Sequence, residues 1–359
     1  MASLKDAAER QAFSLAIDAA LKSLNKDREK ALLNIVNLVQ KFMGNNFRKE
    51  SYEGAKKMIM NPDHKWMRYV NRLLDETDPH VAKMTALNLG YQAAFAGTKK
   101  IRKMREVEQC NIPWLILMDP TSACNLHCTG CWAAEYGNKL NLTFDEIDSI
   151  IQQGKKLGVY MYIYTGGEPL TRKNDLIRLC EKHNDCVFLC FTNATLIDEE
   201  TVEWLKKDPP MKVNVTLYGG GNETYKKLCG HPTGYDAATK AIDLMHDAGI
   251  FVNINASFTK YNLDDMEDIF AFGKRREIQV NAATYMFPPV RSAKDGVTDD
   301  AVRFTAEEAG RARAMADKYR LSKEEVEIRL KALHEGRDDF MGGEEECERT
   351  PDEKMGCMA

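Results

Sequence analysis

The sequence lacks the features that would direct it to a membrane or to nucleic acid. It contains no uninterrupted apolar run near the roughly 20 residues that a membrane-spanning helix needs. Its first residues, Met1 to Asp6, lack the apolar core of a secretory signal. A net charge of −4 gives no global attraction to nucleic acid or to acidic membranes. We therefore expect no membrane and no nucleic-acid partner.

Cysteine is too sparse for a disulfide scaffold. The chain has ten cysteines in 359 residues, whereas small secreted domains that depend on disulfides are far denser in cysteine. The cysteines are clustered, which indicates a reducing compartment and metal chemistry. We therefore predict a cytoplasmic location.

Three cysteines lie close together in the run from Asp119 to Trp132, where Cys124, Cys128 and Cys131 are spaced C-x3-C-x2-C. Three thiolates so close in sequence can converge on one small object if the backbone wraps around it. Cysteine is the usual ligand of each iron in a four-iron cluster, so three cysteines would leave one iron open. A zinc site that adds His127 is the alternative, although zinc ligands usually come as two separated pairs.

Two kinds of periodicity divide the chain. Residues 1–108 carry apolar residues at helical spacing and predict an all-helical N-terminal domain. In the core, residues 109–298, short apolar runs alternate with helical segments, which predicts βαβ units and a parallel sheet. A charged helical segment follows over residues 299–359. The fold class is therefore α/β, with strands expected at residues 114–118, 159–165, 186–191, 212–218, 251–257 and 278–285.

The polar candidates follow the predicted strands. In barrel-like parallel sheets the chemistry lies at the carboxyl ends of the strands. The cysteine run follows the first strand, and a Gly-Gly-Glu-Pro stretch at residues 166–169 follows the second. Asn193, Tyr218 and Ser257 end later strands. We expect these groups to share one edge of the sheet.

The cysteine spacing together with Gly166-Gly167-Glu168-Pro169 resembles the radical S-adenosylmethionine (SAM) enzymes, whose GGEP motif follows an apolar strand. This resemblance implies a partial (β/α)6 barrel and a [4Fe–4S] cluster on Cys124, Cys128 and Cys131. It also implies that SAM chelates the fourth iron through its amine and carboxylate. Reductive cleavage of SAM would then give a 5′-deoxyadenosyl radical that abstracts a hydrogen atom from a substrate.

The same resemblance implies a set of SAM contacts. Backbone carbonyls of the two glycines and the Glu168 carboxylate would accept hydrogen bonds from the SAM amine. Other strand ends would contact the carboxylate, ribose or adenine. Each assignment has an alternative. The Gly-Gly-Glu-Pro stretch would then be a plain strand-to-helix turn, Asn255 and Ser257 would be buried polar residues hydrogen-bonded to backbone, and Trp132 would shield the cluster from water. The predicted cofactor-binding residues are Gly166, Gly167, Glu168, Asn193, Thr216, Tyr218, Asn255, Ser257 and Trp132.

The C-terminal region resembles the start of a cysteine-rich SPASM or twitch extension. Cys347 and Cys357 would belong to an auxiliary iron–sulfur cluster whose other ligands are absent, as in a truncated extension. The extension and the stretch from Thr216 to Tyr225 resemble maturases that modify peptides or proteins. Peptide maturation is therefore the first expectation for the substrate. Haem-type cofactor biosynthesis is the alternative among enzymes, with a small-molecule substrate. A flavodoxin or ferredoxin is the expected electron donor, and a non-catalytic iron–sulfur electron carrier is the alternative to an enzyme.

Two further expectations concern packing. Gly90, Ala94 and Gly97 form a stripe of small residues that predicts a close helix contact. The remaining cysteines in the first 300 residues are expected to be buried core residues, since free cysteine commonly behaves as a small hydrophobe. They are Cys110, Cys180, Cys186, Cys190 and Cys229.

Overall fold

The computed structural model describes most of the chain: residues 4–24, 26–43, 48–62, 64–129, 131, 133, 137, 139–207, 211–283 and 303–320. The chain divides into two compact units. The first unit holds residues 1–126, 133–216 and 236–253, and the second holds residues 127–132, 217–235 and 254–359.

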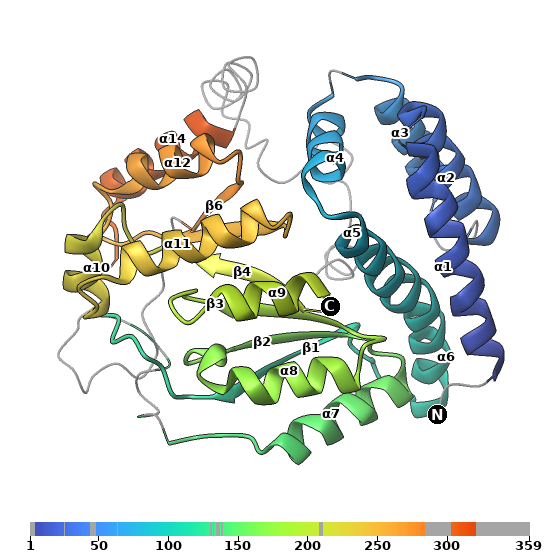
Figure 1. The fold of residues 1–359 in the computed structure, drawn as a ribbon, viewed down its shortest axis with the longest axis horizontal. Coiled ribbons are helices and arrows are strands. Elements are labelled where there is room, and N and C mark those ends of the chain that lie inside the picture. Colours follow the sequence, from blue (N-terminus) through green and yellow to red (C-terminus); the bar gives the residue numbers. More distant parts are fainter. Residues whose placement is uncertain are drawn as a thin grey trace. The chain divides into compact units, whose positions relative to one another are not determined.

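The first unit begins with a run of helices, shown in blue to teal in Figure 1. They are α1 (Leu4–Leu24), α2 (Arg28–Met43), α3 (Lys49–Ile59), α4 (Lys65–Glu76), α5 (Pro79–Thr85), the π-helix η1 (Ala86–Gly97) and α6 (Thr98–Glu108). No strand occurs among the described residues of this stretch, in agreement with the helical periodicity.

The strands and helices then alternate, as predicted. Six strands form one sheet in the order β1-β2-β3-β4-β5-β6, and every pairing with a defined register is parallel. This is the strand order of a partial (β/α)6 barrel, so the predicted α/β class is confirmed. The strands are β1 (Leu115–Thr121), β2 (Met161–Gly166), β3 (Val187–Thr192), β4 (Met211–Thr216), β5 (Val252–Ser257) and β6 (Val280–Ala283).

Helices separate the strands, as the predicted βαβ units require, and one more helix follows β6. They are α7 (Phe144–Leu157), the 3-10 helix η3 (Pro169–Arg172), α8 (Lys173–Lys182), α9 (Glu199–Lys207), α10 (Asn222–Cys229), α11 (Gly234–Asp247), α12 (Met266–Arg275) and α14 (Ala306–Arg320). The sequence reading did not anticipate α10. Thr143 and Glu146 form a capping box at the start of α7, and Thr305 and Glu308 exchange the same pair of bonds before α14.

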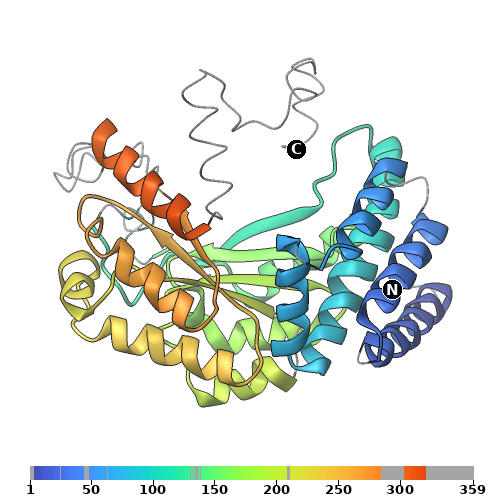
Figure 2. The ribbon, with the colours of Figure 1, turned by 90° about the horizontal axis from the view of Figure 1, so that it is seen from above.

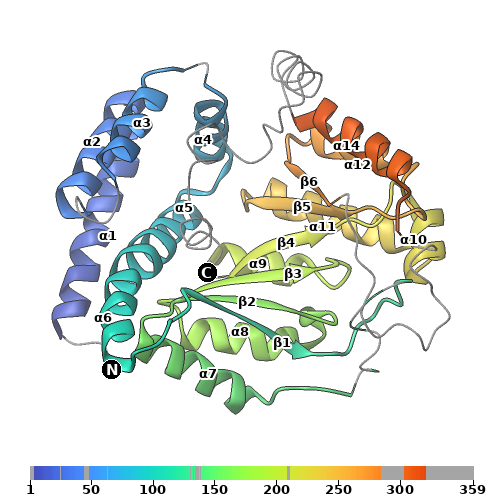
Figure 3. The same cartoon turned by 180° about the vertical axis from the view of Figure 1, so that it is seen from behind.

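The two faces of the sheet formed by β1 to β4 differ in burial. Helices α7, α8 and α9 cover one face, as Figures 2 and 3 show. Alternate residues point toward these helices and are almost fully buried, including Tyr164, Phe188 and Val213. Tyr164 and Phe188 stack with ring centroids 5.4 Å apart. The opposite face remains open enough that Leu117, in the middle of β1, is 57% exposed.

A close backbone contact joins η1 to the turn after α7. A Cβ atom on Gly97 would lie 2.6 Å from the Gly158 carbonyl oxygen, and one on Gly158 would lie 2.8 Å from the Gly97 carbonyl oxygen. The predicted stripe is therefore right for Gly97 and wrong for Gly90 and Ala94, which are exposed. The error has a physical cause, because η1 is wound with i→i+5 hydrogen bonds and presents a different set of residues from an α-helix.

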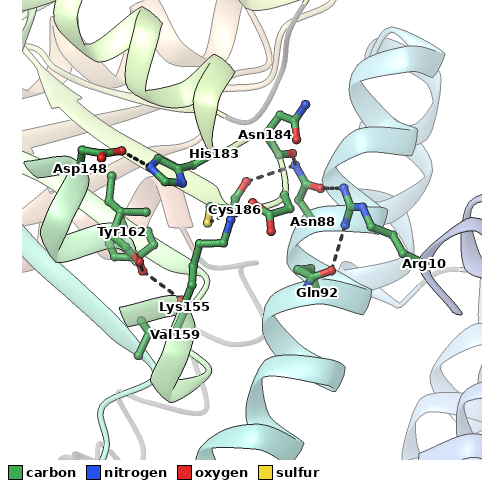
Figure 4. Close-up of polar contacts among 12 residues, drawn as sticks. Arg10, Asn88, Gln92, Asp148, Lys155, Val159, Tyr162, His183, Asn184 and Cys186 are labelled. Atoms are coloured by element: carbon green, nitrogen blue, oxygen red, sulfur yellow. Dashed lines mark hydrogen bonds and ion pairs between the residues drawn. The ribbon is translucent and has the colours of Figure 1, made fainter. Parts of the chain in front are cut away.

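Asn88, also on η1, forms a second bridge within the first unit (Figure 4). Its side chain is 1% exposed and donates to the carbonyl oxygens of Asn184 (3.0 Å) and Cys186 (3.1 Å), just before β3. The Arg10 guanidinium donates in turn to Asn88 Oδ1 at 2.5 Å and to Gln92 Oε1 at 3.2 Å. These hydrogen bonds fix α1 and η1 against the sheet.

The second unit contains the end of β5, β6, α10, α12 and α14. Asn255 pairs with Asn281 across β5 and β6. Tyr225 on α10 is fully buried, and its hydroxyl accepts a hydrogen bond from the Tyr218 N–H. Among the described residues, no helix in either unit is long and apolar enough to span a bilayer.

We expect Gly158→Ala to destabilise the protein by about 2 kcal/mol or more. Gly158 has φ +102°, where a Cβ costs about 1–2 kcal/mol, and the added methyl would also meet the Gly97 backbone. Gly54→Ala in α3 is the matched control. Nothing lies within 4 Å of its Cβ position, and removing a helical glycine stabilises by about 0.5–1 kcal/mol. Urea unfolding measures both, and equal effects would contradict the contact.

Candidate functional site

The Gly-Gly turn after β2 lies directly against the backbone that leads into the cysteine run. Gly167 N–H donates to the Thr121 carbonyl (2.9 Å) and Glu168 N–H to the Ala123 carbonyl (2.7 Å). Gly166 has φ +110°, and a Cβ there would lie 2.6 Å from the Thr121 oxygen. A Cβ on Gly167 would overlap the Ala123 carbonyl and lie 2.6 Å from the Ser122 oxygen. Only glycine at both positions permits this approach.

Glu168 is buried at the same place, with 1% of its surface exposed. Its Oε1 accepts from Thr192 Oγ1 (2.7 Å) and Leu170 N (2.9 Å), and its Oε2 accepts from Asn193 N (2.8 Å). Burial raises the pKa of Glu168, and these three hydrogen bonds oppose the rise. An ionised carboxylate has about four acceptor sites, so one remains for the predicted SAM amine.

Asn193 ties the end of β3 to the cysteine run. Its Nδ2 donates to Asn125 Oδ1 (2.9 Å), and its Oδ1 accepts from the Thr195 N–H (3.0 Å) and hydroxyl (2.7 Å). Asn125 Nδ2 closes the ring by donating to Thr195 Oγ1 (2.7 Å). Sequence reasoning expected a SAM contact at Asn193 and did not anticipate this ring. The ring joins the end of β3 to Asn125, the residue that follows Cys124 in the sequence.

The three predicted cluster ligands are divided between the two units, and one of them has a donor to its sulfur. Cys124 belongs to the first unit, where the Leu126 N–H points at its Sγ at 3.4 Å. Such a donor stabilises negative charge on sulfur. Cys128 and Cys131 belong to the second unit, and Cys131 N–H donates to the Cys128 carbonyl at 3.2 Å. None of the three forms a disulfide with another described cysteine.

A backbone clamp in the second unit holds the segment that carries Cys128. His127 N–H donates to the Cys229 carbonyl and Thr129 N–H to the Leu228 carbonyl, both at 2.8 Å. These acceptors come from the last two residues of α10. The helix that sequence reasoning missed therefore positions one of the predicted cluster ligands.

Cys128 has two polar neighbours in the second unit. A hydrogen bond to Cys229, together with burial, raises the pKa of Cys128. Burial, followed by the nearby Cys128 and Cys229 thiols, raises the pKa of Tyr218. Cys229 is buried as expected, but it lies beside a predicted ligand and not in a plain apolar core.

The remaining cysteines divide into two groups. The core expectation was right for three of them, which are fully buried, and wrong for Cys110, which is exposed because it follows the end of α6 at the surface. The buried three are Cys180, Cys186 and Cys190.

The donor set fits an iron–sulfur cluster in its chemistry, since three cysteine side chains outside any disulfide and an N–H donor to one sulfur are present. Within the described residues, no three His, Cys, Asp or Glu side chains are gathered in position to hold a metal ion. The cysteines are shared between two units that are described separately. Ligation of one cluster by Cys124, Cys128 and Cys131 therefore stays a prediction.

The other predicted SAM contacts fall at strand ends. Thr216 ends β4 and Ser257 ends β5. The carbonyls of Tyr218 and Ser257 both accept from Asn262 Nδ2, at 2.8 and 3.0 Å. Asn255 Oδ1 accepts from Asn281 Nδ2 at 3.4 Å. Their contacts with SAM remain predictions. Trp132, Cys347 and Cys357 lie outside the described residues.

Sequence reasoning missed a polar stripe on β4. Lys212, Asn214 and Thr216 are half-buried and alternate with buried apolar residues. A parallel sheet covered by helices on both faces has near-continuous apolar strands. Strict polar–apolar alternation in a βαβ context was therefore the available signal that one face is open to a ligand.

We expect Glu168→Gln to destabilise the protein by about 1–3 kcal/mol. The amide nitrogen of the glutamine would replace a carboxylate oxygen that accepts a hydrogen bond, so a buried N–H or O–H group would face another donor. Glu203→Gln is the control. Glu203 is exposed on α9, and a surface substitution of this kind stays within about 0.5 kcal/mol. Chemical denaturation of the cluster-free protein measures both, and a neutral Glu168→Gln would contradict the three-donor arrangement.

Comparison with known proteins gives a family match for the central part of the chain. Residues 118–273 match the family model described as the radical SAM superfamily. The AdoMet-dependent heme synthase of Methanosarcina barkeri is 29% identical over 172 residues, which are 47% of this chain and 49% of that protein. The Fe-coproporphyrin III synthase of the same organism is 31% identical over 162 residues, 44% of this chain and 40% of that protein. The chain therefore spans under half the length of these two relatives.

Among solved structures, Streptococcus suis SuiB bound to the precursor peptide SuiA aligns with a TM-score of 0.45 and 21% identity, over 68% of this chain and 56% of SuiB. The matched family segment contains the cysteine run, the Gly-Gly-Glu-Pro turn and β2 to β5. The family implies a [4Fe–4S] cluster and SAM. Residues 118–273 of this chain therefore form a radical SAM domain.

Proposed function

We propose that the protein binds a [4Fe–4S] cluster through Cys124, Cys128 and Cys131, cleaves SAM reductively, and removes a hydrogen atom from a carbon of its substrate. The observation that carries this proposal is the packing of the Gly166–Glu168 turn on the backbone before Cys124. That contact would hold the amine-binding turn and the first cluster ligand in one fixed arrangement.

The chain's own groups would bind and orient the cofactors. Among the described residues, no donor reaches the Gly167 carbonyl, which leaves it to accept from the SAM amine. Glu168 would supply a neighbouring acceptor, held by its three internal donors. Thr216, Tyr218, Asn255 and Ser257 would contact the rest of SAM. The cluster and SAM, when bound, supply the one-electron chemistry.

Two substrate classes are proposed. Peptide or protein maturation rests on the resemblance of the stretch from Thr216 to Tyr225 and of the Cys347 and Cys357 region to SPASM maturases. Haem-type cofactor biosynthesis rests on the two Methanosarcina barkeri relatives, which are named for tetrapyrrole products. The names of these relatives favour the second class. The N-terminal stretch favours it too, because no winged-helix module with strands occurs among the described residues of 4–108. Consumption of a tetrapyrrole such as iron coproporphyrin III, against a Cys-containing peptide, would distinguish them.

Several further expectations belong to the same proposal. The helical N-terminal domain is proposed to span residues 1–108, the radical SAM core 109–298, and the linker with the start of a SPASM-like extension 299–359. We also propose a cytoplasmic location, a flavodoxin or ferredoxin as electron donor, and an auxiliary iron–sulfur cluster in a longer form.

After anaerobic reconstitution with iron and sulfide, we expect the protein to convert SAM to 5′-deoxyadenosine when a strong reductant is added. Cys124→Ala should reduce this release to background, because a ligand of the cluster is lost. Cys110→Ala is the control, since Cys110 is exposed and lies outside the cysteine run. Chromatography with mass detection measures the product. A stable cluster with no SAM cleavage would favour the electron carrier instead.

A further inference from the structure

The open face of the sheet carries a row of three apolar side chains that ends in a lysine. Leu117 on β1 pairs with Ile163 on β2, which pairs with Leu189 on β3, which pairs with Lys212 on β4. Residues that pair in a parallel sheet point to the same face. The neighbours of Lys212 along β4 are buried on the helix-covered face. Lys212 therefore lies on the open face, beside Leu189.

The ammonium group of Lys212 has no counter-charge in the described part of the chain. No hydrogen bond or ion pair reaches it there, and burial lowers the pKa of Lys212 to about 8. Asp119 on β1 is the acidic residue of β1 to β4 that lies on this face. It stands three strands away, roughly 14 Å at a strand spacing of about 4.8 Å. Removing an unpaired charge from water is unfavourable, and such groups concentrate at binding sites.

The rest of the row favours a ligand with apolar surface. Leu117 is a large apolar side chain in the centre of a strand, and 57% of it is exposed. Ile163 and Leu189 are half-buried on the same face. An exposed apolar row that ends in a cation is complementary to a molecule with an apolar body and an anionic end.

We propose that Lys212 binds the carboxylate of a ligand whose apolar body lies along Leu117, Ile163 and Leu189. The carboxylate supplies the missing counter-charge, and the ion pair forms in surroundings of low polarity, where it is stronger than in water. The apolar body covers the row and removes it from water.

The position of Lys212 also sets the length of the substrate, and this step rests on the proposed function. Lys212 lies four residues before Thr216, the end of β4, so the two Cα atoms are roughly 13 Å apart along the strand. SAM is expected at the strand ends. A substrate anchored at Lys212 would therefore carry its carboxylate on the order of 10 Å from the carbon that loses hydrogen, so its apolar body must be broad enough to cover the row and also extend toward the strand ends.

The test measures the acetylation of Lys212 and needs no SAM chemistry. The full-length protein is pulsed with acetic anhydride with and without octanoate, and mass spectrometry follows Lys212 beside the exposed Lys206 and Lys207. Octanoate should slow acetylation of Lys212 by the factor 1 + [L]/Kd, about fivefold when its concentration is about four times its Kd. The two exposed lysines should not change. Octanamide, which has the same body without the charge, should not protect.

Two variants separate charge from packing. Saturation-transfer NMR should detect octanoate on the wild type and on Lys212→Arg, but not on Lys212→Met. Lys212→Met should unfold at the same or a higher urea concentration than the wild type, since it removes an unpaired charge and keeps the apolar stem. Equal octanoate binding by Lys212→Met, or no protection of Lys212, would overturn the proposal.

The outcome is distinguishable from a failure of the proposed function. Protection of Lys212 by octanoate in a protein that releases no 5′-deoxyadenosine would leave the carboxylate site in place and refute the radical chemistry. Release of 5′-deoxyadenosine without protection would refute the carboxylate site alone.

Discussion

The site depends on one contact between two stretches of backbone that carry no intervening side chains. Gly166 and Gly167 bring the turn after β2 within hydrogen-bonding distance of the carbonyls of Thr121 and Ala123. A methyl group on either glycine would occupy the space of those carbonyls. Because Ala123 directly precedes Cys124, the turn and the first predicted cluster ligand are positioned together. The buried Glu168 then fixes the end of β3 to the same turn.

The two faces of the sheet formed by β1 to β4 have different roles. On the helix-covered face of β1 to β4, tyrosine, phenylalanine and valine side chains are packed with almost no exposure, and this burial is the main source of stability. The other face keeps a polar stripe and an exposed leucine, which stability alone would not select. Departures from good packing of this kind are expected where a protein binds a ligand.

Much of this arrangement could be predicted from the sequence. Apolar periodicity located all six strands and the helical N-terminal stretch, since short-range patterning determines these elements. What escaped prediction depends on tertiary contacts. The π-winding of η1 moved Gly90 and Ala94 to the surface. The ring of Asn125, Asn193 and Thr195 joins residues about 70 positions apart, and no spacing in the sequence reports such a distance.

The most direct test of the account is the Gly167→Ala variant, reconstituted anaerobically and examined by electron paramagnetic resonance of the reduced cluster with and without SAM. The account predicts that the variant keeps its helical circular dichroism but loses the change in the cluster signal that SAM causes in the wild type, because the added methyl separates the turn from the Ala123 carbonyl. A Gly167→Ala protein whose cluster signal responds to SAM as the wild type does would contradict it.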